Sequence, residues 1–425
     1  MDKNNPRRKF LKQLGMVSFA AMPISAIAKH ERIEKIHSPL PAPSPENEQY
    51  WELVKKKFMV PKNLIMVNAA NLCPSPGTIV EQVNNYTKEF LGKNVSFQYR
   101  TVFADARALS LKMLAEFLGV SKSEIGITRN TSESNTIVIN SLDLKAGDEV
   151  VIWDQNHPSA RITLEQRATR YGFTVKKLSL PISPSSPTEL IDLFSKSITS
   201  KTKLLAFSHI SNVSGMALPA KELCAIAKQK NVLTLVDGAQ SFGSMDLNLK
   251  EMGCDFYTAS THKWLMGPLE NGILYMKQEH LEKIWPNVIG GGWHDGTSTV
   301  DEKICVLGQR NEASPVAIPS IIEFHHSIGK SNISKRVIQL NSYLKDEIRK
   351  KIPAAEFITP LSPNLSAGIV IVILPGKDPA IVYQDLYAKY GIAAANVGGI
   401  RLSPHIYNTL EDIDKIADAL KALSA

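Results

Sequence analysis

The segment Thr258-Ala259-Ser260-Thr261-His262-Lys263-Trp264 follows directly on apolar residues and places one lysine among hydroxyls and a histidine. Earlier in the chain, Leu233-Thr234-Leu235-Val236-Asp237-Gly238-Ala239-Gln240 is a second apolar run that ends in a carboxylate. Short apolar runs bounded by polar and glycine residues are typical of buried strands. The two segments therefore predict neighbouring strands with an acid, Asp237, and an amine, Lys263, at their ends.

Strands and helices alternate on the N-terminal side of these two segments. Apolar runs predict strands at 125–128, 149–153, 173–178, 203–208 and 232–236, and helical periodicity predicts helices at 107–119, 158–171, 188–195 and 219–230. This alternation predicts a mostly parallel sheet covered on both faces by helices, with ligands at the carboxyl ends of the strands. The polar clusters at 154–157, 208–212, 237–240 and 260–263 fall at such ends, so we expect one pocket there.

The chain of 425 residues exceeds what one hydrophobic core usually supports, so two domains are expected. We assign residues 47–310 to a large ligand-binding domain with an N-terminal arm. Residues 311–425 form a smaller C-terminal α/β domain, with helices expected at 315–328, 331–351, 379–390 and 410–423 and a strand at 368–374.

The first 28 residues have the composition of an export signal, with Arg7-Arg8-Lys9-Phe10-Leu11-Lys12 followed by a short apolar run and Ala26-Ile27-Ala28. The paired arginines resemble a twin-arginine signal, which directs a folded protein out of the cytoplasm. Residues 29–46 are rich in proline and predict an extended tether. We expect a periplasmic or otherwise exported protein with no stable membrane insertion once the signal is removed, because the apolar run is too short to span a bilayer.

The charge and the cysteines argue against several classes of partner. The formal charge is +8, but residues 1–28 hold five basic residues and one acidic residue, which leaves 44 basic and 40 acidic residues, or +4, in the remainder. That excess is small and scattered, so no nucleic acid partner is expected. The cysteines, Cys73, Cys224, Cys254 and Cys305, lack metal-ligand spacing, and we expect buried free thiols and no metal site.

An amine and an acid at neighbouring strand ends suit one particular cofactor, pyridoxal 5'-phosphate. The amine of a lysine forms a Schiff base with the cofactor aldehyde and then acts as acid and base, while a carboxylate keeps the pyridine nitrogen protonated. Lys263 and Asp237 are the candidates for these roles. The hydroxyl-rich segment Thr131-Ser132-Glu133-Ser134-Asn135 follows the expected strand at 125–128. Such a composition at the start of a helix is suited to a phosphate.

These motifs resemble the signature of the class V aminotransferase family of fold-type I pyridoxal phosphate enzymes. The resemblance rests on the segments ending at Gln240 and Trp264, and it extends in family order to the segments 131–133, 156–157, 211–215 and 401–409, covering roughly residues 62–423. It implies a large domain with a mostly parallel seven-stranded sheet between helices, and a smaller C-terminal α/β domain. It also implies a homodimer with shared active sites.

The resemblance assigns roles to individual side chains. The catalytic residues would be Lys263, Asp237 and His157, with His157 stacked on the cofactor ring. The phosphate would be held by Thr131, Ser132, Ser260 and His262, while Gln240 would donate to the phenolic oxygen and Asn212 would lie at the edge of the ring. The substrate would be bound by Arg401, through its carboxylate, with Arg100 and Asn68 as further contacts. Gln309 or Arg310 is the candidate for completing the phosphate site of the partner subunit.

The residues just before Arg401 bear on the reaction. Cysteine desulfurases of this family carry a thiol on a loop there, whereas Gly391–Ile400 contains no cysteine, so the prediction is an enzyme that is not a cysteine desulfurase. This approach to Arg401 is more similar to an isopenicillin N epimerase-like branch. We predict transamination of an amino acid or a peptide-borne amino acid. Epimerisation and Cα/Cβ cleavage are the alternatives, and a cofactor-free exported binding protein is the alternative from another class.

Overall fold

The computed structural model describes residues 46–93, 96–291, 293 and 296–425. The expected export signal at 1–28 and nearly all of the tether at 29–46 lie outside the described residues. None of the described helices combines the length and the apolar character that a membrane span requires.

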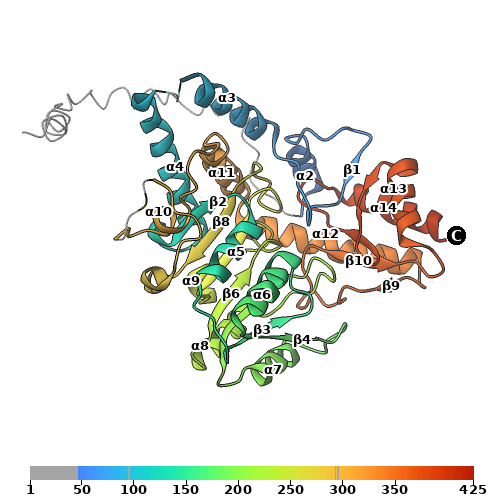
Figure 1. Ribbon diagram of the computed structural model, residues 1–425. Coiled ribbons are helices and arrows are strands. Elements are labelled where there is room, and N and C mark those ends of the chain that lie inside the picture. Colours follow the sequence, from blue (N-terminus) through green and yellow to red (C-terminus); the bar gives the residue numbers. More distant parts are fainter. Residues whose placement is uncertain (1–45, 94–95, 292, 294–295) are drawn as a thin grey trace, which may run out of the picture. The chain divides into compact units, whose positions relative to one another are not determined.

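A seven-stranded sheet forms the centre of the larger part of the fold (Figure 1). Its strands are β2 (Ile125–Thr128), β3 (Glu149–Trp153), β4 (Thr174–Leu178), β5 (Thr202–Ser208), β6 (Leu233–Asp237), β7 (Phe256–Ser260) and β8 (Gly272–Met276). They are arranged in the order β2-β8-β7-β6-β5-β3-β4. Strand β8 runs antiparallel to both of its neighbours, and the other pairs are parallel. The predicted fold, a mostly parallel sheet of a fold-type I enzyme, is confirmed.

Both faces of this sheet are buried at its inner strands, which explains why these are largely apolar, whereas the edge strand β4 has no buried residue and carries Lys176 and Lys177. Within β3, Val150 and Ile152 pack on one face together with helices α5 (Thr131–Ser141) and α6 (Pro158–Tyr171). Val151 and Trp153 pack on the other face, with α4 (Phe97–Leu118), α7 (Pro187–Ser197) and α8 (Ala220–Gln229). Successive side chains of a strand point to opposite faces, so a strand covered by helices on both sides needs apolar residues at every position.

A second core is built from the C-terminal elements, which are coloured orange to red in Figure 1. It contains α12 (Lys330–Lys351), α13 (Pro379–Tyr390) and α14 (Leu410–Ser424) around a sheet of order β12-β13-β10-β9. The strands of that sheet are β9 (Glu356–Phe357), β10 (Val370–Ile373), β12 (Ala395–Asn396) and β13 (Ile400–Leu402). Strand β1 (Ile65–Met66) pairs with β11 (Ile392–Ala393), so the N-terminal arm joins this part of the fold.

The domain boundary at residue 310 stays a prediction. Helix α11 (Ile318–Ile328), which lies after that boundary, contributes Ile321, Ile322 and Phe324 to the core of the larger part. The remaining described elements are α2 (Glu48–Lys55), α3 (Gly77–Lys93), η2 (Lys122–Glu124), α9 (Leu249–Met252), η3 (Gln278–Lys283), α10 (Val300–Ile304) and η4 (Pro315–Ala317).

Two of the differences from the sequence prediction concern the larger part of the fold directly. Helix α4 begins at Phe97 and not at 107, because Ser96 caps it by accepting a hydrogen bond from the Tyr99 backbone N–H at 3.3 Å. Strand β8 was not predicted. It follows a turn-like Asn271-Gly272 pair and lies antiparallel between β2 and β7, so the alternation of parallel strands and helices gave no indication of it.

Candidate active site

The carboxyl ends of β6 and β7 bring Asp237 and Lys263 to one cavity of about 230 Å³. That volume is below the roughly 300–1,000 Å³ of pockets for drug-sized ligands and suits a small molecule. The cavity is lined by Asn130, Thr131, Ser132, His157, Ser159, Asp237, Ala239, Ser260, His262 and Lys263. The structure thus brings together seven residues that were predicted from separate segments of the sequence.

The carboxylate of Asp237 is held in a fixed orientation. Asn135 Nδ2 donates to one oxygen at 2.9 Å, and the Ala239 backbone N–H donates to the other at 3.0 Å. The turn that follows is tight, since a Cβ on Gly238 would lie 1.9 Å from a ring carbon of Tyr257, so only glycine fits there. A buried carboxylate held at both oxygens is suited to accept one further N–H from a cofactor ring.

Lys263 contributes an amine without a protein partner. Among the described residues its Nζ makes no hydrogen bond or ion pair. Burial lowers the pKa of Lys263, Asp237 opposes that shift, and Arg401 adds to it. A larger fraction of this amine is therefore neutral than for a lysine in water, as a nucleophile or a base requires.

Two histidines line the same cavity and are biased toward the neutral form. Burial lowers the pKa of His262 to about 4, with a smaller contribution from Lys263, and its buried Nδ1 has no partner among the described groups. Burial also lowers the pKa of His157, whose Nδ1 accepts from the Ser159 backbone N–H at 3.2 Å. His157 caps α6, so its ring is fixed at the cavity wall.

The N-terminus of α5 closes the cavity on one side. Asn130 caps the helix, and the Thr131 backbone N–H donates to the Ser260 hydroxyl at 2.8 Å. The hydroxyls of Thr131 and Ser260 lie 2.6 Å apart. Helix N-termini attract anions through free backbone N–H groups and the helix dipole, so this group of hydroxyls with Ser132 and His262 fits a phosphate.

Arg401 is a buried cation that no acidic residue neutralises in the part of the chain that the structure describes. Its guanidinium donates to the Asn212 carbonyl and to Asn68 Oδ1, both at 3.1 Å, and its Nε has no partner there. Burial lowers the pKa of Arg401 to about 10. Burying an unpaired charge is costly, so the arrangement is suited to an anionic ligand such as a carboxylate.

Five predicted residues are not in the cavity-lining set: Arg401 and Asn68, which contact each other, and Gln240, Asn212 and Arg100. Gln240 uses its amide elsewhere: Nε2 donates to the Ala70 carbonyl at 2.9 Å and Oε1 accepts from the Trp264 indole at 2.7 Å. Asn212 supplies a backbone carbonyl to Arg401. The side chain of Arg100 lies outside the described residues, although its backbone belongs to α4. The proposed contacts of these residues with cofactor or substrate stay predictions.

The sequence reasoning missed three polar residues of the site, Asn130, Asn135 and Ser159. Asn135 lies four residues after Thr131 in α5, which is the spacing of neighbours on one helix face. That spacing is the signal that could have identified it. Ser159 could have been found as the second residue after His157 at the start of an expected helix.

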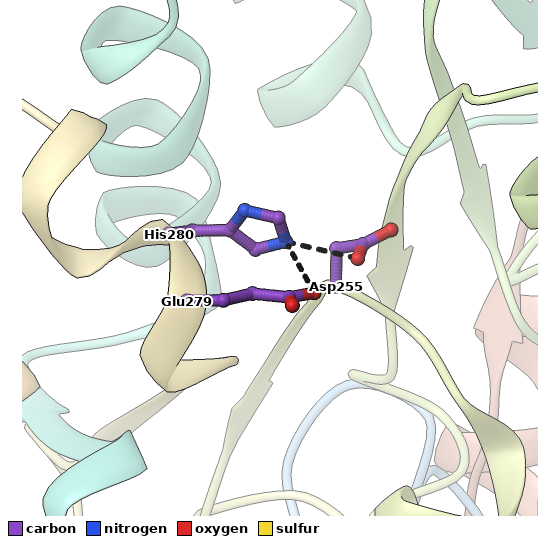
Figure 2. A group of neighbouring side chains, drawn as sticks. All are labelled: Asp255, Glu279 and His280. Atoms are coloured by element: carbon purple, nitrogen blue, oxygen red, sulfur yellow. Dashed lines mark hydrogen bonds and ion pairs between the residues drawn. The ribbon is translucent and has the colours of Figure 1, made fainter.

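A different charged cluster lies at the opposite end of the same strands. Figure 2 shows the His280 ring directed toward Asp255 and Glu279. These three side chains offer atoms within 4.8 Å of one another, a separation that a metal site could have. Both carboxylate oxygens of Asp255 already accept hydrogen bonds from protein groups. One accepts from Lys277 at 2.9 Å and from His280 at 3.0 Å, and the other accepts twice from Thr234. The cluster is therefore an ion-pair network that joins β6, β7 and η3.

Comparison with known proteins places the site in a family. The family model described as "Aminotransferase class-V" matches residues 73–416. The chain belongs to the class V aminotransferase family. The match includes the ends of β6 and β7 and Arg401, and so spans almost all of the site described above.

Relatives within the family carry more than one activity in their names. Isopenicillin N epimerase from Streptomyces clavuligerus is 29% identical over 88% of this chain and 98% of its own length. A probable cysteine desulfurase from Halalkalibacterium halodurans is 30% identical over 84% and 92%. Among solved structures, a cysteine desulfurase from Thermococcus onnurineus has a TM-score of 0.77 at 24% identity, covering 87% of this chain and 97% of that one.

The predicted cofactor, pyridoxal 5'-phosphate, is confirmed by this membership, and the chain is a pyridoxal phosphate-dependent enzyme of the class V aminotransferase fold. The residues present fit the group. The amine of Lys263, which has no partner in the described part of the chain, the doubly held carboxylate of Asp237 and a hydroxyl-lined helix N-terminus surround one cavity, and they match the aldehyde, the ring nitrogen and the phosphate.

The prediction that the chain is not a cysteine desulfurase is wrong. Several relatives that span most of this chain are named probable cysteine desulfurases, and the similar solved structures include a desulfurase and a cystine C–S lyase. The prediction rested on a missing cysteine in residues 391–400. One missing side chain does not decide the reaction, because bond breaking at Cα depends on the lysine and the cofactor.

Proposed function

We propose that the enzyme acts on the amino group of an amino acid, free or carried by a peptide, and that its reaction is transamination. The observation that carries the proposal is Lys263, an amine that has no partner among the described residues and lines one cavity with the fixed carboxylate of Asp237. Arg401 supplies a buried, unneutralised guanidinium for the carboxylate of the amino acid.

Each side chain has a role that follows from its contacts. Asp237 would hold the protonated ring nitrogen, and Thr131 with Ser260 would hold the phosphate at the start of α5. When bound, pyridoxal phosphate supplies an electron-withdrawing ring that stabilises negative charge at the substrate Cα. Lys263 would remove the Cα proton, and its lowered pKa supports that role because the neutral amine is the base.

Transamination is favoured over epimerisation by the set of groups around the cavity. Lys263 is the amine among the described lining residues, and one amine can remove a proton and return it on the same side of the substrate. Inversion at Cα requires a second proton donor on the opposite side.

Epimerisation is the second candidate. Two relatives named isopenicillin N epimerase, 29% and 28% identical, each cover 88% of this chain, which favours that reaction. Cα/Cβ cleavage, including cleavage of a C–S bond, is a further outcome that the experiment must distinguish.

The test is to incubate the purified enzyme, loaded with pyridoxal phosphate, with a panel of L- and D-amino acids and short peptides. Transamination releases a keto acid and requires an amino acceptor, epimerisation inverts the chirality without an acceptor, and elimination releases ammonia or sulfide. Keto acid formation that depends on the acceptor supports the proposal. Inversion or sulfide release without it would replace transamination by the corresponding reaction, and a colourless protein that binds no cofactor would favour the exported binding protein.

We also propose export by the twin-arginine route, with the enzyme folded around its cofactor in the cytoplasm. The support is the Arg7-Arg8 pair ahead of a short apolar run. Cell fractionation of the wild type beside the double variant Arg7→Lys/Arg8→Lys tests it. Equal amounts of both proteins outside the cytoplasm would contradict the proposal.

A homodimer with shared active sites is proposed on the family resemblance, and the contacts of Arg310 favour Gln309 as the residue that takes part in the partner's site. Arg310 is occupied, since it donates to the Ile127 carbonyl at 2.9 Å and to the Thr128 carbonyl at 3.4 Å. Gln309 is exposed and is the candidate to complete the partner's phosphate site. Sedimentation that gives a monomer would contradict the dimer, and Gln309→Ala should weaken cofactor retention in the dimer.

A further inference from the structure

Behind the cavity, four buried hydrogen bonds connect the segments that carry the active-site groups. The Ala70 backbone N–H donates to the Ser403 hydroxyl at 3.1 Å, and Gln240 Nε2 donates to the Ala70 carbonyl at 2.9 Å. The Trp264 indole donates to Gln240 Oε1 at 2.7 Å, and His405 Nε2 contacts the Trp264 carbonyl at 2.8 Å. Because His405 is two residues after Ser403, these bonds return to their starting segment and form a closed circuit.

The neighbours of His405 determine its role in this circuit. The Trp264 carbonyl can only accept, so Nε2 must carry the proton. The Ile406 backbone N–H donates to Nδ1 at 2.7 Å, so that nitrogen must be the acceptor. Both contacts require the neutral Nε2–H tautomer, and burial agrees with this by lowering the pKa of His405 to about 4.

Each member of the circuit lies a few residues or less along the chain from an active-site group. Trp264 directly follows the cofactor lysine, and Gln240 lies in the turn after the carboxylate of Asp237. Ser403 follows Arg401 by two residues, and its N–H donates to the Val67 carbonyl at 2.7 Å beside Asn68, which itself orients Arg401. The circuit therefore links the three segments that carry Lys263, Asp237 and Arg401.

The turn that follows Lys263 contains a residue in an unfavourable backbone conformation. Met266, three residues after Lys263, has φ 58°, a left-handed conformation that is unfavourable for a residue with a side chain. Backbone held in such a conformation persists only where surrounding contacts determine it. The His405 contact with the Trp264 carbonyl and the His325 contact with the Leu265 carbonyl at 3.0 Å supply such contacts on either side of the turn.

We propose that Trp264, Gln240 and His405 are positioning residues whose hydrogen bonds hold the lysine, the ring-nitrogen carboxylate and the substrate-binding arginine in one arrangement. The expected effect on turnover rests on the proposed function, whereas the expected effect on the local stability of these segments does not. It gives the Gln240 amide a connecting role, because its oxygen and its nitrogen both bond to protein groups.

The test uses two variants that open the circuit and one matched control. Trp264→Phe removes the indole N–H donor together with part of the ring. Gln240→Met removes the amide oxygen and nitrogen of Gln240 and leaves Trp264 in place. Trp153→Phe is the control, because Trp153 is also fully buried and its indole nitrogen has no partner among the described groups. A general effect of a smaller buried ring would appear in both tryptophan variants.

The first measurement is backbone amide exchange of the full chain, before and after addition of pyridoxal phosphate. We expect exchange in residues 67–70 and 401–406 to accelerate about 10-fold in both circuit variants, although neither substitution removes a bond made by Arg401. The control should leave these segments unchanged. Acceleration confined to the neighbourhood of the substituted residue, or equal acceleration in the control, would overturn the proposal.

The second measurement separates the catalytic consequence. Once the substrate is known, kcat/KM should fall roughly 10- to 100-fold in Trp264→Phe, with KM for the amino acid rising as kcat falls, since small displacements of reacting groups are costly. His405→Gln, which retains a donor, should keep more activity than His405→Leu. If the wild type binds no pyridoxal phosphate, the proposed function fails, while the exchange experiment on the cofactor-free chain still decides whether the circuit exists.

Discussion

The strands β6, β7 and β8 carry an acid and a lysine at each of their two ends, and the two pairs behave in opposite ways. At the carboxyl ends of the parallel strands, Asp237 and Lys263 line a cavity, and Lys263 makes no ion pair among the described residues. At the other end, Asp255 and Lys277 are bonded at 2.9 Å within a network that includes His280. The chemistry of the side chains is the same, but their arrangement differs.

The difference separates a binding site from a stabilising contact. In the network around Asp255 every charge has a partner, and the hydrogen bonds and Lys277 lower the pKa of the carboxyl to about 2 despite its burial. At the carboxyl ends, burial lowers the pKa of both Lys263 and Arg401; Asp237 only partly opposes the shift of Lys263, and no acidic residue of the described chain pairs with Arg401. A buried cation without a partner is unfavourable in the free protein, so it indicates the place of a ligand.

The largest effect is expected at the cavity lysine. Lys263→Ala should lower activity at least roughly 1,000-fold, because it would remove the amine proposed both to anchor the cofactor and to transfer the proton. The measurement is turnover together with the visible absorbance of the bound cofactor and borohydride labelling located by mass spectrometry. Lys277→Ala is the control, with the same side chain removed from the other end of the strands. If Lys263→Ala retains turnover, or if Lys277→Ala loses as much, the distinction between the two ends fails.

The next effect concerns Arg401, the buried cation that we propose binds the carboxylate of the substrate. Arg401→Gln should raise KM for the amino acid roughly 10- to 100-fold, since a charge-assisted pair with a carboxylate contributes about 1.5–3 kcal/mol. Arg401→Lys should recover only part of this loss, because an ammonium lacks the planar fork. Steady-state kinetics with the amino acid and with its decarboxylated amine provide the check. The amine should react equally slowly with wild type and variant, and a variant effect on the amine would argue against a carboxylate contact.

Removing the carboxylate of Asp255, at the ion-paired end of the strands, should lower stability and leave turnover unchanged. The pKa of Asp255 is about 2 in the folded chain and 3.8 in a model peptide, a difference that corresponds to about 2 kcal/mol. Because the folded value is the lower one, this stability is present above pH 4 and is lost as the pH falls toward 2. Asp255→Asn should therefore be less stable than wild type by about 2 kcal/mol at pH 6, and the gap should narrow below pH 4. Urea unfolding across this range measures it, with turnover at pH 7 as the control.

Local patterns were enough to predict most of the fold and much of the site. The strands β2 and β3 and the helix α6 have the predicted bounds, because each is a short apolar or periodic run with clear turn or cap signals. The grouping of His157, Asp237 and Lys263 followed from the rule that parallel strands share one functional edge, and Thr131 was added as the start of a helix suited to a phosphate.

What the sequence did not reveal depends on contacts between distant segments. The position of β8 is set by antiparallel pairing with β2 and β7, and no local pattern reports such a partner. The amide of Gln240 bonds to Ala70 and Trp264, which lie 170 and 24 residues away, so only the folded chain shows where it points. The reaction could not be predicted from the sequence either, because the absence of a cysteine from residues 391–400 does not decide the chemistry at Cα.

The smallest effect is expected for a third kind of acid–lysine pair, which is neither unpaired nor buried. Lys112 and Glu116 face each other at 3.8 Å on α4, with 62% and 61% of their side chains exposed. Water screens such a pair and ordering the side chains costs entropy, so Lys112→Ala should change the free energy of unfolding by less than about 0.5 kcal/mol. Alanine also favours a helix, which reduces the net loss. Urea unfolding beside Asp255→Asn makes the comparison direct. A loss as large as that of Asp255→Asn would mean that proximity of opposite charges alone produces the stability, and that the burial and saturation of Asp255 are not its cause.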